Sequence, residues 1–250
     1  MFGSLGFADC FIALAARTAY AIGLHRTEVN ASFGESMHQK RFVLHNTARI
    51  FQATMADTKN RDRIWKSLRV VDQFISNLLG RPPSTSDVDC TVKYITLRHD
   101  VDIHMLDASV QIFMIIERVV VEVYSRKRIS LRIASYVSHQ LKGWAANWLS
   151  PLNNVIIGSA SNIKARQTVV GACQTLCTYY YGIMLLTRPF LIYELYEYLG
   201  ASMRTSSSKN DHLEKEKFAD AALDAAVAFV DMLDRVIDTG KLPRRSPTIV

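Results

Sequence analysis

One short segment of the sequence gathers residue types that bind metal ions. His99, Asp100, Asp102, His104 and Asp107 fall within nine positions, and zinc accepts both imidazole nitrogens and carboxylate oxygens. Such a site would lose affinity below about pH 6.5, because protonated imidazoles do not coordinate metal. The simpler interpretation is a polar loop leading into a helix, whose N-terminal end favours acidic side chains. A helical metal-dependent enzyme using this cluster is the alternative.

Established catalytic motifs are missing from the sequence. It contains no GxSxG nucleophile turn, no glycine-rich phosphate loop, no HExxH motif and no dinucleotide fingerprint. The four cysteines are scattered, and Cys173 and Cys177 lie one helical turn apart without a histidine beside them. Cysteines in this pattern are expected in the core of a protein from a reducing compartment. We therefore expect a protein that is not an enzyme, with no catalytic residue, no metal ligand and no cofactor in this chain.

The composition indicates a helical globular chain. Of its 250 residues 49% are apolar and 21% are charged, and 11 Gly and 6 Pro are too few for a protein of many short strands. Charged residues and prolines interrupt every apolar run before the roughly 18 residues that a membrane span needs, so we expect no membrane association. The net charge is +7, but the basic residues are dispersed, and charge alone does not predict DNA binding.

The elements that must position these residues follow from hydrophobic spacing. The strongest helix signal covers residues 63–79, ended by Gly80 and the prolines after it. Aliphatic residues alternate there at four and three positions and should form one buried seam: Ile64, Leu68, Val71, Ile75 and Leu78.

Other helices are expected at 5–22, 36–60, 105–124, 163–187 and 190–199, from a cap at Ser130 to Pro151, and after Asp211. Gly23 should end the first, and Arg188-Pro189 should break the helix that begins at residue 163. The fold is thus expected to be all-α, an irregular multi-helix bundle of about seven to nine helices. We expect residues 1–250 to form a single domain, with a mobile serine-rich linker at 200–210.

The segment RIWKSLRVVDQFISNLLGRPPSTSDVD, residues 63–89, resembles the signature of the fungal-specific transcription factor domain, the middle homology region of binuclear zinc-cluster regulators. Segments 13–26, 186–191 and 218–233 agree with that family in order and rough spacing. The motif is a tryptophan-containing basic entry, an Asp and a Ser on the helix, Leu-Gly-Arg-Pro and an acidic loop. Its residues in this chain are Trp65, Asp72, Ser76, Gly80, Arg81, Pro82, Asp87 and Asp89.

The resemblance implies an all-α regulatory domain that acts in the nucleus in the control of transcription. It implies helix packing, a small effector or a coregulator protein as the means of regulation. A second copy of the chain is a further candidate partner. Zinc and DNA contact belong to the family's six-cysteine module, which this sequence lacks. A stand-alone scaffold or corepressor is a further alternative.

Compared with the family, the domain is expected to be incomplete at both ends, and residues 42–62 are expected to be an insertion or translated intron sequence. Within the motif, Asp72 and Arg81 are placed to pair with each other or to satisfy the last helix carbonyls. An effector-binding Arg81 is the functional alternative.

Overall fold

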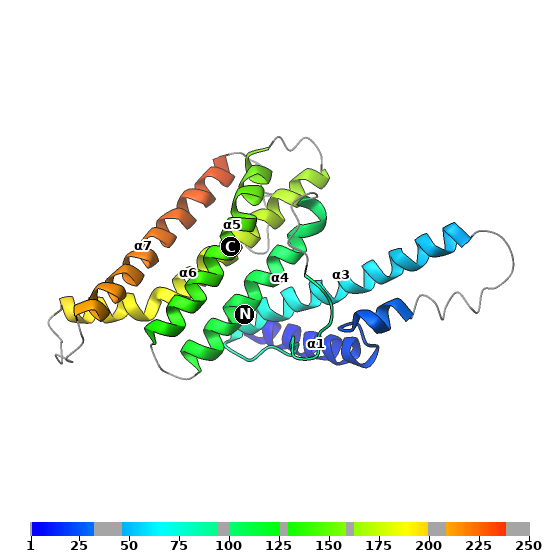
Figure 1. Ribbon diagram of the computed structural model, residues 1–250, viewed down its shortest axis with the longest axis horizontal. Coiled ribbons are helices and arrows are strands. Elements are labelled where there is room, and N and C mark those ends of the chain that lie inside the picture. Colours follow the sequence, from blue (N-terminus) through cyan, green and yellow to red (C-terminus); the bar gives the residue numbers. More distant parts are fainter. Residues whose placement is uncertain are drawn as a thin grey trace. The chain divides into compact units, whose positions relative to one another are not determined.

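The structure, a computed structural model, describes residues 2–32, 47–94, 101–125, 130–158, 163–199 and 209–238. Every regular element in these ranges is a helix, and none of them contains a strand (Figure 1). The prediction of an all-α, multi-helix fold is confirmed. The chain divides into two compact units, residues 1–95 and 96–250. A single domain over residues 1–250, incomplete at both ends, stays a prediction.

The first unit contains α1 (Phe2–Ala21), helical residues 27–32 and α3 (Thr47–Leu79), followed by an irregular segment to residue 94. Gly23 ends α1 with φ of +69°, and the Leu24 N–H donates to the Ala19 carbonyl at 2.9 Å. A Cβ atom at Gly23 would lie 2.7 Å from Val29 Cγ1, so both the backbone and the space require glycine. The predicted cap is confirmed.

α3 buries a different face from the one predicted. Ile64, Val71 and Leu78 are 55%, 46% and 60% exposed, and Leu68 and Ile75 are half-buried. The buried face lies beside this seam and is largely polar. Its members are Trp65, Arg69, Asp72, Gln73 and Ser76, each 3% exposed or less. The prediction of a buried aliphatic seam is therefore wrong, and the physical reason lies in the segment that follows the helix.

The second unit contains α4 (Val101–Val119), the π-helix η1 (Val120–Tyr124), α5 (Leu131–Ile157), α6 (Ile163–Tyr198) and α7 (Lys209–Asp238). α6 packs against α4, α5 and α7. Ser130 caps α5 as predicted, because its side chain accepts from the Ile133 N–H. The indole N–H groups of Trp144 and Trp148, 4% and 6% exposed, donate to α4 at the Ala108 carbonyl and Gln111 Oε1, both at 3.0 Å.

Two helices continue through prolines at which the sequence predicts that they end. α5 continues through Pro151, between the buried side chains of Trp148 and Leu152. α6 continues through Pro189. Proline lacks the N–H that would bond to the carbonyl four residues earlier, and the Tyr124 hydroxyl donates to that carbonyl, of Leu185, at 2.8 Å. The predicted ends before residues 151 and 189 are therefore wrong, and at Pro189 a tertiary hydrogen bond replaces the missing backbone bond.

α6 is long and apolar enough to cross a membrane by length and composition, over Arg166–Tyr198. In the structure 44% of its most apolar window is buried, against the neighbouring helices of the second unit. The central helix of a bundle surrounded by water has the same composition. The expectation of no membrane association stays a prediction.

Two expected features fall partly outside the described residues. Of the expected insertion at 42–62, α3 covers the part from Thr47 onward, and Thr58, Arg61 and Asp62 all hydrogen-bond to Asn30. Of the expected linker, residues 200–208 lie outside, and Lys209 begins α7. The insertion and the linker both stay predictions.

Candidate functional site

The carboxylate of Asp72 fixes the start of the segment that follows α3. The side chain is 1% exposed. One oxygen accepts from the Ser84 N–H at 3.1 Å, and the other accepts from the Thr85 N–H at 2.7 Å and from the Thr85 hydroxyl. Backbone donors that become buried need an acceptor, and a carboxylate is a strong one. This requirement places the polar face of α3 inside.

Arg69 completes the arrangement from one turn earlier on α3. It is 1% exposed, and Nη1 donates to the Thr85 carbonyl at 2.7 Å. Its Nη2 forms an ion pair of 2.7 Å with Asp87 Oδ2, whose other oxygen accepts from the Tyr94 hydroxyl at 3.0 Å. Burial and the Asp87 carboxylate raise the pKa of Tyr94, so this hydroxyl keeps its proton. We name Arg69, Asp72, Thr85 and Asp87 the Arg69–Asp72 network.

Trp65 anchors the same segment through its indole. The residue is fully buried, and its N–H donates to Cys90 Sγ at 3.2 Å. Tyr20 and His25 lie against it, with ring centroids 5.3 and 5.7 Å away. Burial, then the charge of Arg26, lower the pKa of His25, and Asp89 opposes them. Its Nδ1 is buried without a hydrogen-bond partner, so protonating His25 in the folded state is unfavourable.

The remaining motif residues lie where α3 ends. Gly80 has φ of +65°, and the Arg81 N–H donates to the Ser76 carbonyl at 3.0 Å, a glycine-based helix end. The Arg81 side chain is 60% exposed and pairs with Asp9 at 2.7 Å. It does not pair with Asp72, so this alternative is wrong, and the backbone of Arg81 rather than its guanidinium reaches a helix carbonyl. Pro82 and Asp89 are exposed.

Sequence reasoning missed Arg69 and Thr85. The signal was present, because Trp65, Arg69, Asp72 and Ser76 repeat at four, three and four residues, the same alternation as the aliphatic seam. The network has one evident chemical capacity: its donors and acceptors join α3 to residues 84–87. The network therefore connects two segments of the chain. Ligand binding needs an open space as well.

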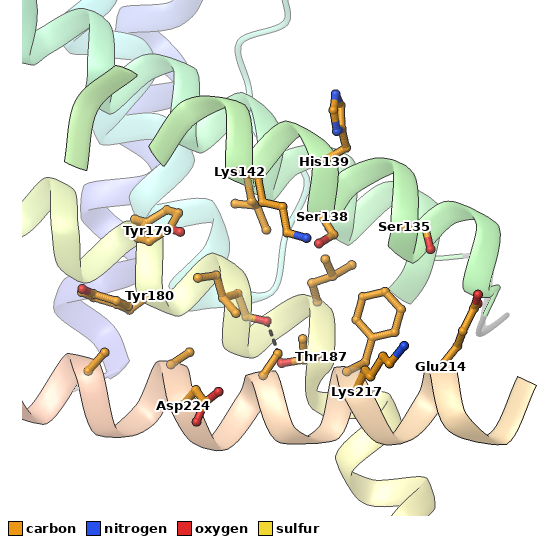
Figure 2. Close-up of a pocket in the computed structure, with 17 residues that line it drawn as sticks. Ser135, Ser138, His139, Lys142, Tyr179, Tyr180, Thr187, Glu214, Lys217 and Asp224 are labelled. Atoms are coloured by element: carbon orange, nitrogen blue, oxygen red, sulfur yellow. Dashed lines mark hydrogen bonds between the residues drawn. The ribbon is translucent and has the colours of Figure 1, made fainter. Parts of the chain in front are cut away.

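An open space lies in the second unit, between α5 and α7 with α6 as its floor (Figure 2). This groove has a volume of about 650 Å³, within the usual range for small-molecule sites. Apolar side chains from all three helices form its floor and inner wall: Leu141, Ile183, Leu186, Phe218 and Ala225. An apolar surface of this kind suits a ligand with a hydrophobic body.

Charged and hydroxyl groups line the rim of the groove. α5 contributes Lys142 and Ser138, and α7 contributes Glu214, Lys217 and Asp224 (Figure 2). The four charged side chains are exposed, and none of them has an ion-pair partner among the described residues. Charges of both signs are therefore free to orient a polar ligand. No motif in the sequence indicated these positions.

A small cluster of metal-ligating types lies where Glu197 of α6 meets His212 of α7. Ligand atoms of Glu194, Glu197 and His212 lie within 4.8 Å of one another. His212 Nε2 is 3.0 Å from one Glu197 oxygen, and the Tyr193 hydroxyl donates to the other at 2.8 Å. The Tyr193 hydrogen bond, with smaller effects from His212 and Lys215, lowers the pKa of Glu197. A hydrogen bond between His212 on α7 and Glu197 on α6 accounts for this proximity.

The cluster expected at His99 to Asp107 lies largely outside the described side chains. His99 and Asp100 are not described, and Asp102 and His104 are described only as part of α4. Asp107 is 3% exposed, inside the second unit. Whether these residues meet at a metal ion stays a prediction.

Fold and sites together define an all-α helical-bundle protein with a buried polar network and an open groove. No family model matches the chain, and no solved structure does. The chain is similar to Filamentous growth regulator 27 of Candida albicans, with 24% identity over 232 residues and 88% of this chain covered. The alignment covers 27% of the relative, so the chain spans about a quarter of its length. The name of this relative describes a regulator, not an enzyme.

Proposed function

We propose that this chain is a regulatory domain of a fungal transcription factor, that it works in the nucleus and that it is not an enzyme. The observation that carries the proposal is the similarity to a growth regulator over 88% of the chain, an extent that requires both compact units to take part. The resemblance of residues 63–89 to the fungal-specific transcription factor domain supports the same proposal. The aliphatic seam of α3 plays no part in it, because three of its five side chains, Ile64, Val71 and Leu78, are exposed.

In this proposal the two units have different tasks. The Arg69–Asp72 network holds residues 84–87 on α3, which gives the first unit one defined surface. The groove between α5, α6 and α7 receives a small effector or a segment of a coregulator. DNA contact, and the zinc it needs, belong to a module outside this sequence. Binding at the groove then changes which surface the domain presents to the transcription machinery.

A reporter experiment tests the proposal. The chain is fused to a heterologous DNA-binding module and expressed in yeast, and reporter output is compared with that of the module alone. We expect output to change, the fusion to accumulate in the nucleus, and Asp72→Ala to abolish the change. Asp89→Ala is the matched control, because Asp89 is exposed on the same segment. An unchanged reporter, with the intact fusion present in the nucleus, would refute the regulatory proposal.

The sign of the effect separates the regulatory alternatives. Activation fits an activator domain, and repression fits a corepressor or scaffold. The enzyme alternative is tested on the purified protein by metal analysis, because a hydrolase built on the residues from His99 to Asp107 needs bound metal. One tightly held metal ion per chain, lost on changing His104, would contradict the proposal of a non-enzyme.

A further inference from the structure

α7 has two apolar faces, and the described residues cover only one of them. The inner face packs against the rest of the second unit, with Ala222, Ala225, Met232 and Val236 at most 5% exposed. The outer face carries large aliphatic side chains that are all more than half exposed. They are Leu223 at 55%, Val227 at 61%, Val230 at 52% and Ile237 at 57%.

These four side chains form a stripe, which the exposed Asp234 interrupts between Val230 and Ile237. At about 100° per residue they fall within a sector of roughly 80° on the helix surface. From Leu223 to Ile237 the stripe extends about 21 Å along the axis. Their intervals of four, three and seven residues are those by which one helix contacts another lying along it. Single exposed aliphatic residues are common on protein surfaces, but their frequency does not explain four of them aligned along one helix.

Aspartates border the stripe. Asp224, Asp231 and Asp238 follow one another at seven-residue intervals along one side, and Asp220 and Asp234 lie seven residues before and after Val227. All five are exposed. α7 contains eight acidic and four basic residues, a net charge of −4, in a chain whose net charge is +7. Acidic charge is thus concentrated on the helix that carries the stripe.

We propose that the outer face of α7 is the docking surface for an amphipathic helix of a partner protein, one that carries Lys or Arg beside its apolar positions. Leu223, Val227, Val230 and Ile237 would insert between the apolar side chains of the partner, and the aspartates would pair with its cations. The inference does not rest on the proposed role in transcription, since it concerns binding by α7 alone.

Charge selects this occupant over two others. A second copy of α7 would bring its own aspartates against the aspartates of the first, and like charges across a helix pair are destabilising. An anionic membrane surface attracts basic amphipathic helices and repels acidic ones. A basic amphipathic helix satisfies both the apolar stripe and its acidic border.

The test uses the full chain and two fluorescein-labelled synthetic peptides of about 18 residues, long enough to follow the stripe. Both have leucine at the same helical spacing, but one carries lysines beside the leucines and the other glutamates. Fluorescence anisotropy should show saturable binding of the lysine peptide alone, weakening as salt rises from about 0.05 to 0.5 M because exposed charges are screened.

Substitutions on and off the stripe locate the contact. The double variant Val227→Ser with Val230→Ser should weaken binding of the lysine peptide at least about tenfold, as expected for residues central to an interface. The control Ile192→Ser removes an exposed aliphatic side chain from α6 and should leave binding unchanged. Asp231→Asn with Asp234→Asn should weaken binding at low salt and remove most of the salt dependence. Circular dichroism verifies that each variant keeps its helices.

Three results would overturn the proposal. The first is equal binding of the lysine and glutamate peptides, and the second is equal weakening by the stripe variant and the Ile192 control. The third comes from sedimentation of the chain alone. A dimer that the Val227 and Val230 substitutions dissociate would assign the stripe to a second copy of the chain.

Discussion

Replacing Asp72 by alanine removes the acceptor on which the start of the 84–94 segment depends. The carboxylate is 1% exposed and accepts three hydrogen bonds, from the Ser84 N–H, the Thr85 N–H and the Thr85 hydroxyl. Alanine fits the helix well, so the helical conformation itself is not the part that is damaged. The loss of stability comes from the Ser84 and Thr85 donors, which no longer have their acceptor.

The size of the effect follows from how far water can reach those donors. Ser84 is exposed, so water replaces the carboxylate for its N–H at little cost. Thr85 is 1% exposed, and each of its two donors left buried without a partner costs about 1–3 kcal/mol. We expect a total of about 2–4 kcal/mol, since the hydroxyl can rotate and recover part of its loss.

Hydrogen exchange read by mass spectrometry measures this locally. A loss of 2–4 kcal/mol corresponds to exchange of the Thr85 amide that is faster by roughly 30- to 1,000-fold. Peptides from residues 80–94 should show the change, and peptides from α5 should exchange at their original rates if the second unit folds independently. Tryptophan fluorescence is less selective, because Trp65 belongs to the first unit and Trp144 and Trp148 to the second.

Asp89→Ala is the control, because it removes an exposed carboxylate from the same segment. Exposed substitutions of this kind usually change stability by less than about 0.5 kcal/mol. If Asp72→Ala accelerated exchange no more than Asp89→Ala, the Arg69–Asp72 network would not hold the segment, and our explanation of the buried polar face would be wrong.

Three further predictions concern other contacts. Tyr124→Phe should lower the free energy of unfolding by about 1–2 kcal/mol in urea titrations, because the Leu185 carbonyl then has neither an amide nor a hydroxyl donor; no loss would mean that water takes its place. Since the pKa of His25 is lowered from 6.5, its contribution to stability is present above pH 6.5 and is lost as pH falls through the folded value; His25→Gln should flatten that pH profile. Val71→Ser should lower the free energy of unfolding by less than about 1 kcal/mol, because the side chain is 46% exposed. A loss above about 2 kcal/mol would show that the aliphatic seam is buried after all.

Local chemistry decided the features that the sequence predicted well. Gly23, Gly80 and Ser130 each act within a few residues of their own position, through a positive φ or a hydrogen bond to the adjacent turn. The burial of Trp144 and Trp148 follows from helical periodicity alone. Such signals are complete within a short window, so one sequence by itself is sufficient to find them.

Contacts from distant segments decided the features that it predicted poorly. α6 continues through Pro189 because Tyr124, on η1, supplies a donor. The groove joins α5, α6 and α7, and nothing in the spacing within one helix brings Lys142 and Lys217 to the same opening. The groove could therefore be located only from the folded structure and not from the sequence.

The choice between the two faces of α3 follows from comparing their energies. Full burial of a large aliphatic side chain contributes about 1.5–3 kcal/mol, so Ile64, Val71 and Leu78, half exposed, forgo about 1 kcal/mol each. Burying that face instead would remove the hydrogen bonds of Arg69 and Asp72 to residues 84–87, each worth about 1.5–3 kcal/mol where one partner is charged. The polar face prevails because it alone supplies acceptors and donors to a segment that has no secondary structure of its own. Hydrophobic periodicity cannot register that difference, since both faces repeat at the same interval.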